Sequence, residues 1–163
     1  MDVRTLMHQA VVNHSFRECV VHDERRLTFS EAWDWGIRLA IGLLNLGLET
    51  GDRIGVIEDN SIQAADFFHG TAIANLVRVP LYPRNGREAH HHMLSHTGCK
   101  ALMASADYFH EVEGLDSEIE SLEHMLVRDN QYESWLLDQS PNLPDIEIDP
   151  EDNFIIRHTG GTT

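Results

Sequence analysis

Segments with helical periodicity alternate with short apolar runs along most of this chain. The apolar runs at 53–58, 76–79, 101–104, 124–127 and 154–156 are typical of buried strands. This alternation predicts an α/β fold, a mostly parallel sheet with helices on both faces. In such sheets ligands bind at the carboxyl ends of the strands. The 163 residues suit one domain or a large part of one.

The most strongly marked helix lies between Thr28 and Gly47. Thr28 and Glu31 have the spacing of a capping box, in which each side chain bonds the other residue's free backbone N–H. Apolar residues follow at helical spacing, and Gly47 stands where a left-handed cap is needed. We therefore expect one long amphipathic helix here.

The remaining elements are shorter. Asn60 or Ser61 is a candidate cap for a helix that continues to Ile73. Further helices are expected at 3–13, 87–97, 108–113 and 132–138, with a strand at 19–22. Residues 139–152, which contain three prolines, are expected to form a surface connector.

Acidic residues dominate one part of the chain. The net charge is −15, and residues 107–152 hold fifteen acidic residues against a single Arg128. Such a surface repels nucleic acid and anionic membranes. A solvated acidic face is favoured, while a docking patch for a basic partner and adaptation to high salt remain alternatives.

Nothing in the sequence indicates a membrane-bound or secreted protein. No apolar run reaches the roughly 18 residues of a transmembrane segment, and the N-terminus lacks a basic region followed by an apolar stretch. Cys19 and Cys99 form neither a disulfide framework nor a close metal-ligand pair. We expect a cytoplasmic protein with no transmembrane segment.

The final residues have the composition of a phosphate-binding loop. Thr159, Gly160, Gly161, Thr162 and Thr163 follow an apolar run directly. Glycines let backbone N–H groups approach anionic oxygens, and threonine hydroxyls add neutral donors. A flexible chain end would have the same composition, so these residues alone leave both interpretations open. The P-loop of NTPases and the Gly-x-Gly-x-x-Gly dinucleotide motif are both absent.

Residues 155–163, Ile-Ile-Arg-His-Thr-Gly-Gly-Thr-Thr, resemble the start of the AMP-binding signature of the adenylate-forming superfamily. In that family an apolar strand leads into Thr-Ser/Gly-Gly-Thr-Thr-Gly-x-Pro-Lys-Gly. Residues 27–31 are similar to the family's LTYxEL helix start, and residues 46–54 to its LGxxxGDRV turn. Residues 79–84 are similar to VPLNPR, and Asn60-Ser61 falls where relatives carry a comparable pair.

The resemblance implies an AMP-forming acyl-CoA synthetase. Such an enzyme joins a carboxylic acid to ATP as an acyl-adenylate, releases pyrophosphate, and passes the acyl group to coenzyme A. It implies that Thr159, Gly160, Gly161, Thr162 and Thr163 hold the β- and γ-phosphates, with Mg²⁺ spreading their charge. Gly160 replaces the serine of many relatives, and His158 replaces a more usual aromatic residue.

The resemblance also implies that residues 1–163 are the N-terminal subdomain of a larger ligase domain, ending inside the loop. The adenine site, the metal-binding glutamate, the acyl tunnel and the C-terminal domain with its catalytic lysine would lie further on. We therefore expect no catalytic residue here and no activity from this chain alone. A fatty or other hydrophobic acid is the expected substrate. An acyl-AMP ligase that loads a carrier protein and a non-catalytic acidic interaction module are the alternatives.

Histidines cluster at His90-His91-His92 and His96. His92 and His96 are spaced to share a helix face, which is one part of a zinc or nickel site. Further converging ligands are not identifiable, so a plain surface helix without a metal is the favoured interpretation.

Overall fold

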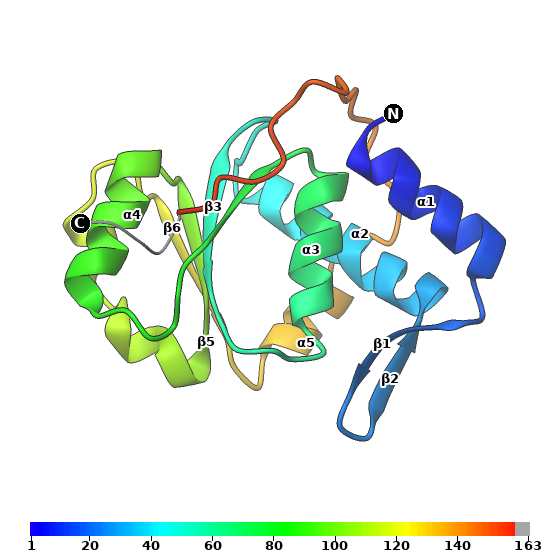
Figure 1. Ribbon diagram of the computed structural model, residues 1–163, viewed down its shortest axis with the longest axis horizontal. Coiled ribbons are helices and arrows are strands. Elements are labelled where there is room, and N and C mark those ends of the chain that lie inside the picture. Colours follow the sequence, from blue (N-terminus) through cyan, green and yellow to red (C-terminus); the bar gives the residue numbers. More distant parts are fainter. Residues whose placement is uncertain (159–163) are drawn as a thin grey trace.

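Four parallel strands form the centre of the molecule (Figure 1). The computed structural model describes residues 1–158. The strands are β3 (Arg53–Ile57), β4 (Val77–Pro80), β5 (Ala101–Ser105) and β6 (His124–Arg128). They lie in the order β4-β3-β5-β6. The first of them in the sequence, β3, is therefore an inner strand, and later strands are added on both of its sides.

Helices cover both faces of this sheet, as the sequence predicted (Figure 1). One face carries α1 (Val3–His14), α2 (Phe29–Asn45), α3 (Ala64–Ile73) and α5 (Tyr132–Leu137). The other carries α4 (Arg87–Thr97) and the short 3₁₀ helices η1 (Ala106–Glu111) and η2 (Leu115–Ser117). None of the helices in residues 1–158 combines the length and apolarity needed to cross a bilayer.

Side-chain alternation along β5 creates two separate cores. Ala101 and Met103 pack with α2, α3 and α5, whereas Leu102 and Ala104 pack with α4 and the 3₁₀ helices. All four are fully buried. A strand that is covered on both faces must be apolar at every position, which is why this run showed no alternation in sequence.

Helix α2 has the capping box that its sequence predicted. The Thr28 hydroxyl accepts from the Glu31 backbone N–H at 3.2 Å, and the Glu31 carboxylate accepts from the Thr28 N–H at 2.8 Å. Gly47 follows the helix with φ of +94°, a conformation that favours glycine.

Three local features differ from the sequence-based predictions. Strand β1 (Glu18–His22) pairs antiparallel with β2 (Arg25–Thr28), a strand that the sequence analysis did not predict. Residues 106–111 form a 3₁₀ helix in place of the helix predicted at 108–113. Ile155 forms a single bridge rather than a full strand. The hairpin strand was missed because its polar, half-exposed residues carry no clear apolar pattern.

Candidate functional site

The carboxyl edge of the parallel sheet is where the sequence places its candidate loop. The segment that precedes the loop runs alongside β4 in the parallel direction, with Ile155 opposite Arg78. The Arg78 N–H donates to the Phe154 carbonyl at 3.1 Å, and the Ile156 N–H donates to the Arg78 carbonyl at 3.0 Å. This pairing brings His158 to the same edge as the ends of β3 and β4.

Thr159, Gly160, Gly161, Thr162 and Thr163 lie outside the described residues. Their assignment to phosphate binding therefore stays a prediction. What the structure does place is the residue immediately before them, His158, and the side chains that surround it.

Tyr82 holds the chain at this point. Its hydroxyl donates a hydrogen bond to the backbone carbonyl of His158. Tyr82 belongs to the loop that follows β4, between Pro80 at the end of the strand and Pro83, and both prolines fix φ and lack a backbone donor. Residues 81–86 form neither helix nor strand, and through Tyr82 this loop anchors the entry to the candidate loop.

Two histidines of α4, His92 and His96, lie close to His158. His92 and His96 share a helix face, as their spacing predicted, and their rings stack with centroids 5.6 Å apart. The His158 ring lies 6.3 Å from that of His96. His90 does not join them, because it is fully buried in the core beneath α4. Within residues 1–158 no three His, Cys, Asp or Glu side chains are arranged to hold a metal ion.

The pKa of His158 is lowered by its surroundings. Partial burial lowers the pKa of His158, and the nearby imidazoles of His96 and His92 lower it further because adjacent positive charges repel. Burial likewise lowers the pKa of His90. His158 and His90 are therefore neutral at pH 7, and a neutral imidazole can accept or donate a proton but adds no positive field for a phosphate.

Two carboxylates that follow β3 are already bonded to other side chains. Glu58, after β3, is bonded to the Arg128 guanidinium at the end of β6. Asp59 accepts a 2.5 Å hydrogen bond from the Tyr108 hydroxyl, and this bond is the main reason that the pKa of Tyr108 is raised. These contacts tie the loops after β3, β5 and β6 together. They were not predictable from sequence, because the partners are 49 and 70 positions apart.

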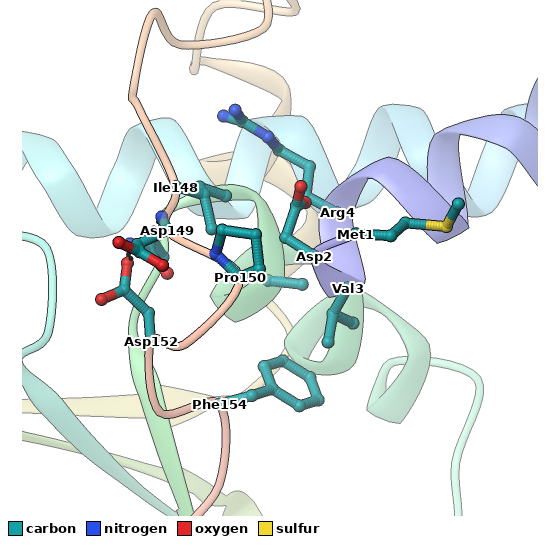
Figure 2. Close-up of a pocket in the computed structure, with 11 residues that line it drawn as sticks. Met1, Asp2, Val3, Arg4, Ile148, Asp149, Pro150, Asp152 and Phe154 are labelled. Atoms are coloured by element: carbon teal, nitrogen blue, oxygen red, sulfur yellow. Dashed lines mark hydrogen bonds between the residues drawn. The ribbon is translucent and has the colours of Figure 1, made fainter.

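A small pocket lies at the opposite edge of the sheet (Figure 2). It has a volume of about 70 Å³ and lies between the start of α1 and the connector, near Asp152 and Phe154. Here Arg4 donates to the Ile146 carbonyl at 2.7 Å and Asn75 donates to Asp152 at 2.8 Å. The pocket is well below the roughly 300–1,000 Å³ of small-molecule sites, so these contacts fasten the connector rather than form a ligand site.

Comparison of the sequence with known proteins identifies a family and several relatives. A family model described as "AMP-binding enzyme" matches residues 7–163. The chain is 27% identical to triostin synthetase I of Streptomyces triostinicus over 161 residues, which cover 97% of this chain and 31% of that protein. It is 26% identical over 141 residues to the long-chain-fatty-acid–CoA ligase FadD13 of Mycobacterium tuberculosis, covering 85% of this chain and 28% of that one.

Solved structures show the same fold. An anthranilate CoA ligase, AuaEII, in complex with anthranoyl-AMP superposes with a TM-score of 0.91 at 15% identity, over 99% of this chain and 32% of that one. The inhibitor-bound N-terminal domain of FACL13 from Mycobacterium tuberculosis superposes with a TM-score of 0.89 at 22% identity, over 99% and 42%. The chain spans about a third of the length of the curated relatives that it matches.

Proposed function

The chain belongs to the AMP-binding enzyme family, and from that premise we propose that it is the N-terminal part of an AMP-forming acid–thiol ligase. Such a ligase forms an acyl-adenylate from ATP and a carboxylic acid, releases pyrophosphate, and transfers the acyl group to the thiol of coenzyme A. The relatives named as CoA ligases support this reaction class. The chain alone corresponds to about a third of such a protein, so we propose that it is inactive by itself.

The observation that carries the proposal is the pairing of Ile155 with Arg78. It directs the chain into the candidate loop at the carboxyl edge, where nucleotides bind in parallel sheets. The hydrogen bond from Tyr82 to the His158 carbonyl fixes the residue before Thr159. In our proposal, Thr159 to Thr163 donate backbone N–H and hydroxyl groups to the β- and γ-phosphates of ATP.

Glu58 and Asp59, two carboxylates that follow β3, are not free to hold a divalent metal. Glu58 is bonded to Arg128, and Asp59 accepts a hydrogen bond from Tyr108. Mg²⁺ is bound by oxygen ligands and substrate phosphates. In this proposal it would rest on the phosphates and the threonine hydroxyls, where it would spread negative charge.

We propose a fatty or other hydrophobic carboxylic acid as the substrate. Relatives are named as long-chain and medium-chain acyl-CoA ligases, and a structural counterpart as an anthranilate CoA ligase. The similarity to triostin synthetase I, whose name does not specify coenzyme A, favours one alternative: an acyl-AMP ligase that loads a carrier protein.

Carboxylate-dependent exchange of pyrophosphate into ATP tests the inactive-fragment part of the proposal. We expect no exchange above background from residues 1–163 with decanoate or benzoate, because the remaining two thirds of the relatives' length is absent. Robust exchange by this chain alone would show that it carries a complete active site and would overturn the fragment assignment.

Binding of Mg²⁺-tripolyphosphate to residues 1–163 tests the loop itself by calorimetry. We expect Thr162→Val to weaken binding by about ten- to a hundredfold, since a hydrogen bond to a charged group contributes about 1.5–3 kcal/mol. Thr5→Val is the matched control, because Thr5 is exposed on α1. Equal affinity for the wild-type chain and Thr162→Val would contradict the assignment of Thr162 to phosphate binding.

A further inference from the structure

Strand β6 is an outer strand of the parallel sheet, and nothing among residues 1–158 pairs with its outer edge. The outer strand on the other side, β4, differs, because the segment at Ile155 pairs with it. The His124 N–H donates to the Lys100 carbonyl, before β5, at 3.2 Å. Alternate residues of a strand bond to opposite neighbours. The backbone N–H and C=O groups of Met125 and Val127 therefore point away from β5, where another extended chain could pair with them.

A groove of about 380 Å³ runs along this free edge. It is lined by residues 123–127 along β6, by Leu46 after α2, and by Tyr132 and Trp135 of α5. Leu126 and Trp135 pack against the core but are only partly buried. In strand addition, the free backbone of an edge strand provides hydrogen bonds and neighbouring pockets accept alternate side chains. The groove beside β6 combines both features.

Acidic side chains lie at both ends of β6. Glu123 precedes the strand and lines the groove, and Asp129 follows the strand. Both are exposed, and neither belongs to an ion pair within the part of the chain that the structure describes. A strand rises about 3.3 Å per residue, so these two positions are roughly 20 Å apart. An extended segment with a basic residue near each end would match this charge pattern, and an acidic segment would be repelled.

A second copy of this chain fits the edge less well than a different protein does. A two-fold axis beside β6 would make the two copies of the strand antiparallel. Glu123 of each copy would then lie near Asp129 of the other. Like charges opposite each other destabilise a strand pair, and each chain carries a net charge of −15. Charge therefore favours a basic segment from another protein.

We propose that the edge of β6 binds an extended segment of another protein, in which apolar and polar residues alternate between two basic ends. The segment would add a strand to the sheet through hydrogen bonds to the backbone of Met125 and Val127. Its apolar side chains would lie in the groove beside Trp135, and its basic ends near Glu123 and Asp129. The inference does not depend on the proposed ligase activity, because it involves neither ATP nor the residues after His158.

Amide hydrogen exchange, followed by NMR on residues 1–163, tests the strand addition. The probe is the peptide Lys-Val-Thr-Val-Thr-Val-Lys with blocked ends. At saturation it should slow exchange of the Met125 and Val127 amides by about tenfold or more, because both gain hydrogen-bond partners. Amides of the hairpin β1–β2 should be unchanged. The proposal would be overturned if the peptide did not bind at millimolar concentration, or if it bound without slowing exchange at these two amides.

Two altered peptides separate backbone pairing from charge. Replacing both threonines with proline keeps the charge but removes two backbone donors, so binding should be lost. Replacing both lysines with glutamate keeps the alternating pattern but reverses the charge, so binding should weaken at low salt. If the proline peptide bound as tightly as the original, the attraction would be one of charge alone and strand addition would be refuted.

Glu123→Gln tests the role of charge at the edge itself. It should weaken binding of the lysine peptide about threefold at 10 mM NaCl, the usual effect of losing one exposed ion pair. At 1 M NaCl the difference should vanish, because the charges are screened. Glu147→Gln removes the same charge at an exposed position of the connector and is the matched control. Equal affinities of the two variants at low salt would overturn the assignment to a basic partner.

Discussion

Asp66 is the residue whose environment departs most from what its type prefers. It lies in α3 with only 4% of its surface exposed. Burial raises its pKa to about 7, and the negative charge of Glu133 adds to this, while Arg25 opposes it. Glu133 itself is bonded to Arg25 at 2.9 Å and to Gln63 at 3.1 Å. A carboxyl group is therefore partly protonated at neutral pH beneath the hairpin β1–β2.

This environment predicts that the chain loses stability as the pH rises. The ordinary pKa of an aspartate is 3.8, against about 7 for Asp66 in the folded chain. Between these values the folded state holds a proton that the unfolded state lacks, so stability falls as pH increases. From pH 5 to pH 8 we expect Asp66 to cost about 2–3 kcal/mol of unfolding free energy.

Urea denaturation of the wild-type chain and Asp66→Asn at pH 5 and pH 8 measures this effect. Asp66→Asn should not show this fall in unfolding free energy between pH 5 and pH 8. Asp116→Asn, at an exposed position, should behave like the wild-type chain. Histidines such as His69, whose pKa is lowered mainly by desolvation, contribute more to the stability of the fold as the pH rises. They are unchanged in Asp66→Asn, so the difference isolates Asp66. If the unfolding free energies of the wild-type chain and of Asp66→Asn changed equally with pH, the prediction would be refuted.

Among the elements, α2 and α3 make the closest helix contact in the fold. Gly36 of α2 faces His69 of α3, and a Cβ built on Gly36 would lie 2.4 Å from the Cβ of His69 and 3.3 Å from the backbone of Gly70. Atoms so near the backbone cannot move aside independently. The two helices must therefore separate if any side chain is added at Gly36.

Gly36→Ala should lower the unfolding free energy by about 1–3 kcal/mol, the usual cost of overpacking a core. The matched control is Gly86→Ala, because Gly86 has a negative φ and an added Cβ there meets nothing within 4 Å. Chemical denaturation compares the two variants. If Gly36→Ala were as stable as Gly86→Ala, the close contact between α2 and α3 would not limit the fold.

The elements that the sequence predicted best are those specified by local chemistry. The capping box of Thr28 and Glu31 and the left-handed Gly47 after α2 are determined by residues only a few positions apart. The hairpin strand β2 and the single bridge at Ile155 depend on tertiary partners instead. Arg78 and Ile155 are 77 positions apart in the sequence, and no local pattern announces their pairing.

The candidate site was predictable only in part for the same reason. The glycine and threonine loop was identified from its composition and its family resemblance. The anchoring of His158 by Tyr82 and the joint placement of Arg78 and Arg157 were missed. Both depend on the register between β4 and the segment after the connector. The sequence did contain one signal. Arg157 is two positions after Ile155, so in an extended segment both side chains lie on the same face. The partner strand β4 was needed to show that Arg78 lies on that face too.

At the scale of the whole molecule, charge is distributed unevenly. Residues 107–152 carry most of the net charge of −15, and they form η1, η2, β6, α5 and the connector. Few of these acids have partners: Glu118 is paired with Arg87, and Glu133 with Arg25. Exposed acids such as Glu120 have no ion-pair partner within residues 1–158. Mutual repulsion should therefore reduce the stability of the chain at low ionic strength.

Charge reversal at one exposed position in each part of the chain tests this repulsion. Glu120→Lys should raise the unfolding free energy by about 0.5 kcal/mol at 10 mM NaCl, where charges interact over about 30 Å. The gain should vanish at 1 M NaCl, where that distance is about 3 Å. Glu24→Lys makes the same change in net charge beside Arg25 and Arg26, so it should not stabilise the chain. If Glu120→Lys gave no gain at low salt, the acids of 107–152 would be fully screened by solvent, and the charge would bear on partner choice rather than on stability.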